Sequence, residues 1–161
     1  MRRLVLTAIA ALLVAAPALA VERTFRITPI TIGGANLHGS KRAYIKQWGR
    51  VQLGRLEGGY TRLTFKKRHI EVYFKKGKKG AVAIVTWDHR DRTLDKVGPC
   101  ATVAAFKRAY PNAKPFKQGT RVVAYRLGRL IFTAESKRIG DVMLATPAVS
   151  PYVALNAPEC R

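Results

Sequence analysis

Two segments of the chain, about 60 residues apart, carry the same ordered set of helix signals, and internal repetition of this kind limits the possible folds. Each segment opens with a residue suited to cap a helix, spaces two aromatic residues four positions apart and ends on a residue that stops a helix. The matched pairs are Ser40 and Thr102, Ala43 and Ala105, Tyr44 and Phe106, Trp48 and Tyr110, and Gly49 and Pro111. The sequence therefore predicts two short helices at corresponding positions.

Three strand-like segments follow each predicted helix. They are Tyr60–Phe65, His69–Lys75 and Ala81–Trp87 after the first, and Thr120–Arg126, Arg129–Glu135 and Asp141–Thr146 after the second. The apolar residues Ile70, Val72 and Phe74 alternate with more polar neighbours, which is typical of a half-buried strand. We predict an α+β fold with two tandem α-β-β-β repeats, each a short helix packed on an antiparallel meander.

These patterns also divide the chain. Residues 1–20 are a predicted signal peptide, 21–95 the first repeat with its linker, 96–146 the second repeat, and 147–161 a C-terminal tail. The linker, residues 88–97, is polar and holds three of the nine acidic residues. A further strand is expected over Thr24–Ile32, at a sheet edge because Pro29 lacks a backbone donor.

The first twenty residues have the three parts of a cleavable export signal. Arg2 and Arg3 are followed by an apolar run from Leu4 to Ala16, and Ala18-Leu19-Ala20 supplies a cleavage site. The run is shorter than the roughly 20 residues that cross a bilayer, and no later stretch is apolar enough to do so. We predict a secreted or periplasmic protein that begins near Val21 after cleavage.

The mature chain is strongly cationic. The net charge of +21 loses two arginines with the signal, which leaves 28 basic and 9 acidic residues, or +19. Such a charge attracts anionic polymers, anionic surfaces and acidic proteins. We expect an acidic protein or an anionic polymer as the partner, and any nucleic-acid binding to be non-specific.

Two cysteines, Cys100 and Cys160, remain in a chain predicted to reach an oxidising compartment. An even number of cysteines in that setting favours a disulfide, and no C-x-x-C spacing suggests a redox or metal site. The bond would attach the tail to the start of the second helix.

Taken together, the segments Gly39–Gly49 and Ala101–Pro111, with the strands after each, resemble secreted bacterial tandem-repeat proteins of the β-lactamase-inhibitor-protein-like group. The resemblance implies a protein-binding module that uses the open face of its sheet. That group has a disulfide inside its repeats, whereas Cys100 and Cys160 here connect the second helix with the tail. No functional residue is transferred from the group.

Basic residues gather in two predicted turns. The first cluster is Lys66, Lys67 and Arg68, and the second is Lys75, Lys76, Lys78 and Lys79. Both are candidates for binding a polyanion, although successive turns of a meander lie at opposite ends of the sheet, and solvated turns are the alternative interpretation. Tyr73 and Tyr125 are expected opposite the apolar stripe, as exposed aromatic contacts beside basic residues.

The string from Trp87 to Asp91 is the most enzyme-like part of the sequence, because His89 lies between two carboxylates. Neighbouring side chains at the end of a strand point apart, so no catalytic residue is assigned. The three histidines, His38, His69 and His89, lack a ligand spacing, and the sequence predicts no metal and no cofactor.

The sequence thus favours an exported, non-enzymatic binding module of the cell envelope or extracellular space that recognises an acidic protein or a polyanion. One alternative is a hydrolase-like enzyme acting on an anionic envelope substrate through His89 and Asp88. The other is a structural envelope protein whose charge only keeps it at an anionic surface.

Overall fold

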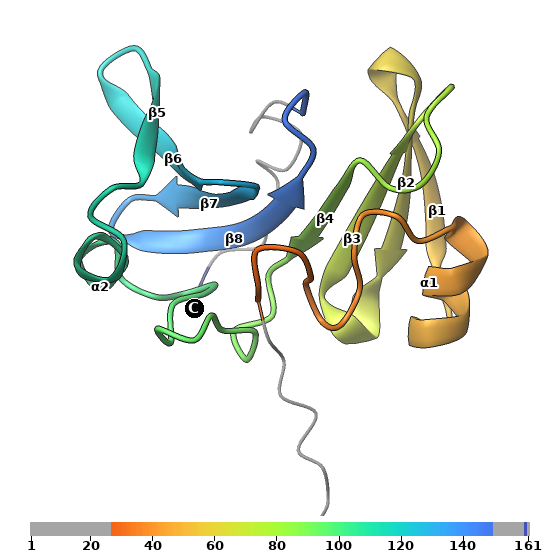
Figure 1. Cartoon of the computed structure of the whole chain (residues 1–161), viewed down its shortest axis with the longest axis horizontal. Coiled ribbons are helices and arrows are strands. Elements are labelled where there is room, and N and C mark those ends of the chain that lie inside the picture. The colour runs from red at the N-terminus through yellow and green to blue at the C-terminus, as the bar shows by residue number, and fades with distance from the viewer. Residues whose placement is uncertain (1–26, 150–159, 161) are drawn as a thin grey trace, which may run out of the picture.

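The computed structural model describes residues 27–149 and residue 160, which form one antiparallel sheet of eight strands and two short helices (Figure 1). The elements are α1 (Lys41–Trp48), β1 (Gln52–Leu56), β2 (Tyr60–Phe65), β3 (Ile70–Lys75), β4 (Ala83–Thr86), α2 (Val103–Ala109), β5 (Lys114–Gln118), β6 (Arg121–Leu127), β7 (Leu130–Glu135) and β8 (Arg138–Ala145). The predicted signal peptide and most of the tail lie outside the described residues.

The strand order is β1-β2-β3-β4-β8-β7-β6-β5. β4 and β8 pair at the centre, from Ala83 opposite Ala145 to Thr86 opposite Val142, and this pairing makes one continuous sheet out of the two sets of strands. Figure 1 shows the set β1–β4 with α1 beside it, and the set β5–β8 with α2 beside it.

The predicted α+β class, with two tandem α-β-β-β repeats, is wrong: the protein is mainly β. The helices have only eight and seven residues, and a single sheet runs through the whole described region. Each helix was expected to precede three strands, and each precedes four, because β1 and β5 were not predicted.

β1 and β5 are the two edges of the sheet, which explains why their sequences carry no clear strand signal. Most of their residues are exposed, so apolar and polar positions do not alternate. Gly54 in β1 and Pro115 in β5 are residues that strand interiors avoid, and Pro115 is tolerated at an edge, where its nitrogen need not donate to a neighbouring strand.

The main core lies between the helices and one face of the sheet. Tyr44 of α1 contacts Phe74 of β3, with ring centroids 5.9 Å apart, and Phe106 of α2 contacts Phe132 of β7 at 4.8 Å. Both helices start as expected: the Ser40 side chain accepts a hydrogen bond from the Ala43 backbone N–H. Helices as short as these are stable because their aromatic residues pack on the sheet.

The opposite face of the sheet has a second, smaller core around Tyr73, Val85, Ile131 and Met143. Val149, just beyond β8, packs against it and is 4% exposed. The central strands are therefore buried on both faces.

The segment before α1 forms tight turns. Ile32 makes bridges with both Ile27 and Ala35, and Ile27 donates a backbone hydrogen bond to the Arg92 carbonyl. The described part of the predicted strand Thr24–Ile32 is therefore not a regular strand. Within the described part of the chain, no helix is long and apolar enough to cross a membrane.

Candidate anion-binding site

Four turns or strand ends meet at one end of the sheet, which we call the cationic end. The Lys76 N–H donates to the Gly59 carbonyl, which ties the β3–β4 turn to the β1–β2 turn. The Thr146 N–H donates to the Val82 carbonyl, and the Ala145 N–H to that of Arg129 in the β6–β7 turn. Backbone hydrogen bonds therefore hold segments from both sets of strands together here.

The β3–β4 turn itself carries Lys76, Lys78 and Lys79, all exposed. Gly80 has a φ of +75°, and a Cβ there would lie 2.8 Å from the Leu37 carbonyl oxygen, so this position requires glycine. The close approach fixes the lysine-bearing turn against the segment that precedes α1.

Two hollows open at the cationic end. The first, with a volume of about 390 Å³, lies between the β3–β4 turn, the segment after β8, and Arg129. The second, of about 410 Å³, lies between α1, the β1–β2 turn and the end of β3. Tyr60, Lys75 and Lys78 line both hollows, so the two adjoin.

The basic side chains around the hollows come from distant parts of the chain. They are His38, Lys75, Lys78, Lys79 and Arg129 at the first hollow, and Lys41, Arg55, Lys75, Lys76 and Lys78 at the second. Two of these lysines rest on aromatic rings, with 5.4 Å between Lys41 Nζ and the Phe74 centroid and 5.4 Å between Lys75 Nζ and the Tyr60 centroid.

Among the residues that the structure describes, no acidic one lines either hollow. Of the nine acidic residues, two lie outside the described region, and three of the other seven, Asp88, Asp91 and Asp141, are fully buried. Glu71 is also held internally, by Thr64, Tyr73 and Arg62. Because so many of the carboxyl groups are inside the protein, its surface is more positive than the net charge alone indicates.

The other basic cluster, Lys66, Lys67 and Arg68, forms the turn between β2 and β3, at the opposite end of the sheet. Here the positive charge is partly balanced by Asp91: burial raises the pKa of that carboxyl, and the nearby Arg68 counteracts part of the rise. The structure therefore separates the two predicted clusters, and the second borders the two hollows at the cationic end.

Asp88 and Asp91 make internal contacts at that opposite end. Burial would raise the pKa of Asp88, but the hydrogen bonds from Arg90, as short as 2.7 Å, outweigh it and lower the pKa overall. Asp91 accepts a hydrogen bond from the Thr86 hydroxyl, yet burial dominates and raises its pKa. The segment predicted as a polar linker therefore contains two buried carboxyl groups.

His89 lies on an exposed turn, and its neighbour Asp88 pairs with Arg90 instead. His69 is the histidine nearest Asp88, with 3.9 Å between Nδ1 and Oδ2. The structure thus does not bring together His89 and Asp88, on which the hydrolase alternative relied.

Tyr73 and Tyr125 are 2% and 6% exposed, so the prediction that they form exposed aromatic contacts is wrong. Tyr73 belongs to the second core and donates a hydrogen bond to Glu71. Tyr125 packs under α2, with its ring centroid 4.9 Å from that of Phe106. Tyr60, at the junction of the two hollows, is the partly exposed aromatic residue of the site.

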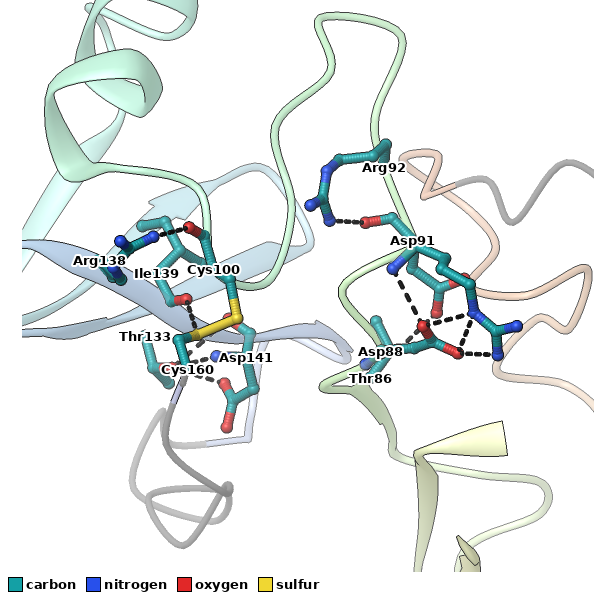
Figure 2. Close-up of a disulfide and its surroundings, with 11 residues drawn as sticks. Thr86, Asp88, Asp91, Arg92, Cys100, Thr133, Arg138, Ile139, Asp141 and Cys160 are labelled. Atoms are coloured by element: carbon teal, nitrogen blue, oxygen red, sulfur yellow. Dashed lines mark hydrogen bonds and ion pairs between the residues drawn. A yellow bond between two sulfur atoms is a disulfide. The ribbon is translucent and has the colours of Figure 1, made fainter. Parts of the chain in front are cut away.

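The structure contains the predicted disulfide between Cys100 and Cys160, with Cα atoms 5.3 Å apart. Figure 2 shows it beside the start of β8 and near Asp141. The Cys100 N–H donates to the Ile139 carbonyl at 2.7 Å, and the Arg138 guanidinium donates to the Cys100 carbonyl at 3.0 Å. Residue 160 is thereby attached just before α2.

Asp141 lies in β8, facing the second core. Its Oδ1 atom accepts a hydrogen bond from the Thr133 hydroxyl at 2.7 Å, and its buried Oδ2 atom has no partner among the described residues (Figure 2). Burial, followed by the nearby carboxylates of Glu135 and Glu71, raises the pKa of Asp141 to about 8. This group is enclosed within the protein, away from the cationic end.

Among the described residues, no group of three His, Cys, Asp or Glu side chains is placed to hold a metal ion. Comparison with known protein families, curated proteins and solved structures found no match to this chain. The cationic end, rather than a recognised motif, is therefore the candidate site.

Several site residues were not predicted, namely Lys41, Arg55 and Arg129. Arg129 shows why: its turn joins the site only because β8 pairs with β4, a contact between segments distant in sequence. The available signal was the presence of basic residues in alternate turns, which must lie at the same end of an antiparallel sheet once the strand order is known.

Proposed function

We propose that this protein is a non-enzymatic binding module that holds an acidic protein or an anionic polymer at its cationic end. The observation that supports this function is the pair of adjoining hollows, whose described lining includes lysine and arginine but no acidic residue. A concave surface lined by charges of one sign concentrates the field and attracts an oppositely charged partner.

The arrangement suits a partner that extends over both hollows. Lys75 and Lys78 lie at their junction, Arg129 borders the first hollow, and Lys41 and Arg55 border the second. A single small anion would meet only part of this set, whereas a polymer or an acidic protein surface can contact cations in both hollows at once. Multiple contacts of this kind give binding a strong dependence on salt.

Export of the protein is part of the proposal. The signal-like residues 1–20 and the disulfide between Cys100 and Cys160 favour a location outside the cytoplasm, where disulfides persist. In that setting, anionic envelope polymers and acidic exported proteins are the available partners.

The test compares two charge-reversal variants that change the net charge equally. Lys78→Glu with Lys79→Glu alters the cationic end, and Lys66→Glu with Lys67→Glu alters the opposite end. Duplex DNA serves as a defined polyanion and poly-glutamate as an acidic polypeptide, each titrated over a range of salt concentrations. The plot of log K against log salt has a negative slope for DNA binding. We expect this slope to be shallower by about 2 in the first variant, because each lost phosphate contact reduces its magnitude by about 0.9.

The control variant should keep a slope close to that of the unaltered protein. Equal losses in both variants would show that binding follows overall charge and not the cationic end, and the proposed function would be wrong. Thermal unfolding of both variants checks that the fold is retained.

A further inference from the structure

The two hollows of the cationic end differ in their floors. In the first, the rim is basic but the floor consists of Leu37, Ala81, Val82 and Val149, all of them at most 6% exposed. In the second, the side of β3 and the β1–β2 turn contribute mostly charged or polar residues around Phe74 and Leu56. The first hollow therefore has the larger set of buried apolar residues beneath its cationic rim, since Phe74 is the one such residue described at the second.

The first hollow also has the dimensions of a small-molecule site. Its volume of about 390 Å³ lies at the lower end of the range of about 300–1,000 Å³ that is usual for such sites. Small-molecule sites are mainly apolar and hold a few well-placed polar groups, which fix the orientation of the ligand. Here those groups are the side chains of Lys75, Lys78, Lys79 and Arg129.

The walls of the hollow are fixed on three sides. The Val82 N–H donates to the Tyr73 carbonyl, and the Val82 carbonyl accepts from the Thr146 N–H, so floor and wall are held by backbone hydrogen bonds. The Val149 N–H donates to the Thr146 carbonyl, and the Val149 carbonyl accepts from the Arg126 guanidinium at 3.3 Å. The floor and wall of the hollow are thus tied by hydrogen bonds, and the charged side chains lie at its rim.

We propose that the first hollow binds an amphipathic anion, that is, a phosphate or carboxylate group carrying a short hydrocarbon chain. The anionic group contacts the lysines and Arg129 at the rim, and the chain lies on the apolar floor. This inference rests on the proposed function, because it uses the same rim cations, and it adds a ligand class that pure charge attraction does not select. An extended polyanion has no apolar part to fill the floor.

An apolar floor predicts that the binding affinity depends on the length of the ligand's hydrocarbon chain. Each methylene group transferred from water to an apolar site favours binding about fourfold. Inorganic phosphate, butyl phosphate and octyl phosphate share one head group, and octyl glucoside has the longest chain without the charge. We expect calorimetric titration to give affinities that rise from inorganic phosphate to octyl phosphate, with octyl glucoside binding more weakly than octyl phosphate.

Substitutions separate the rim from the floor. Ala148 lines the hollow and is exposed, so Ala148→Trp fills the hollow with little effect on packing, and Ala148→Phe is a second filling variant. Both should abolish the rise with chain length. Lys78→Glu with Lys79→Glu should weaken every anionic ligand, and Lys66→Glu with Lys67→Glu should bind octyl phosphate like the unaltered protein.

The amphipathic anion could be a free molecule or the head of a membrane lipid, and vesicles of phosphatidylglycerol distinguish the two. If Ala148→Trp weakens vesicle binding as strongly as octyl phosphate binding, the source is lipid; if it weakens octyl phosphate alone, the source is a free amphiphile. Either result supports the site. Equal affinity for inorganic phosphate and octyl phosphate would overturn the inference and leave the proposed function intact, whereas equal DNA binding by the two charge-reversal variants would overturn the proposed function itself.

Discussion

At the scale of single residues, the carboxyl groups are divided between the interior and the surface. Asp88, Asp91 and Asp141 are fully buried, and their partners differ: a guanidinium donates to Asp88, whereas a threonine hydroxyl donates to one oxygen of each of the other two. Of the three, it is Asp88 that is paired with a guanidinium, that of Arg90, which favours the charged carboxylate. Burial of a carboxyl group without such a partner disfavours its ionised form. Asp141 should therefore make stability depend on pH.

The substitution Asp141→Asn tests whether Asp141 makes the stability of the protein depend on pH. The pKa of Asp141 is about 8 in the folded protein and near 3.8 in the unfolded chain, so between these values the folded state binds more protons and stability falls as pH rises. One proton can contribute at most about 1.4 kcal/mol per pH unit. We expect the thermal midpoint, followed by circular dichroism, to fall less between pH 5 and pH 8 in the variant than in the unaltered protein. Parallel curves would contradict the assignment.

The two wrong predictions for single residues, Tyr73 and Tyr125, have different physical causes. The alternation in β3 correctly placed Tyr73 opposite Ile70, Val72 and Phe74, but alternation shows which residues share a face and not whether that face is covered. Val149 packs on that second face, where sequence reasoning expected solvent. Tyr125 was placed on the wrong face, because β6 is buried on both sides and its alternation is weak.

At the scale of elements, the helices and six of the eight strands were predictable because their signals are local. Ser40 and Thr102 cap the two helices as expected, and β2 spans the predicted residues Tyr60–Phe65. The edge strands β1 and β5 were not predictable, since an exposed strand with glycine or proline has no periodic pattern. The pairing of β4 with β8, which decides the fold class, has no local signal at all.

Ser40→Ala measures how far α1 depends on its cap. The Ser40 hydroxyl accepts from the Ala43 N–H at 3.2 Å, and loss of such a cap usually costs about 1 kcal/mol. In a protein of this size, that corresponds to a decrease in the thermal midpoint of about 2–4 °C. Ser40→Asp keeps a capping oxygen and should retain the midpoint; a similar loss in both variants would show that the hydroxyl acts in another way.

At the scale of the whole molecule, the central strand pair and the disulfide connect distant parts of the chain. β4 pairs with β8 in the middle of the sheet, and Cys160 is joined to Cys100 across a sequence separation of 60 residues. The disulfide was predictable from composition and the export signal, because only two cysteines are present. The cationic end was not predictable, because its turns come together only once the order of the strands in the sheet is known.

Replacing both cysteines with serine should lower the free energy of unfolding by up to roughly 4 kcal/mol, the entropy of closing a loop of this length in the unfolded chain. Guanidinium chloride unfolding of Cys100→Ser with Cys160→Ser against the unaltered protein gives the difference. Reduction of the unaltered protein with dithiothreitol should reproduce it. An unchanged midpoint in both experiments would mean that the bond does not restrict the unfolded chain.

The strand order also has a consequence for the way the protein is assembled. β4, with Ile84 and Val85 at its centre, is completed early in the chain, but its partner β8 follows only after α2, β5, β6 and β7. Until then, β4 is the open edge of a four-stranded sheet, and an unpaired apolar edge is where nascent chains aggregate. We therefore expect that, while the protein folds, its first four strands are open to association with other chains through β4 until β8 pairs with it.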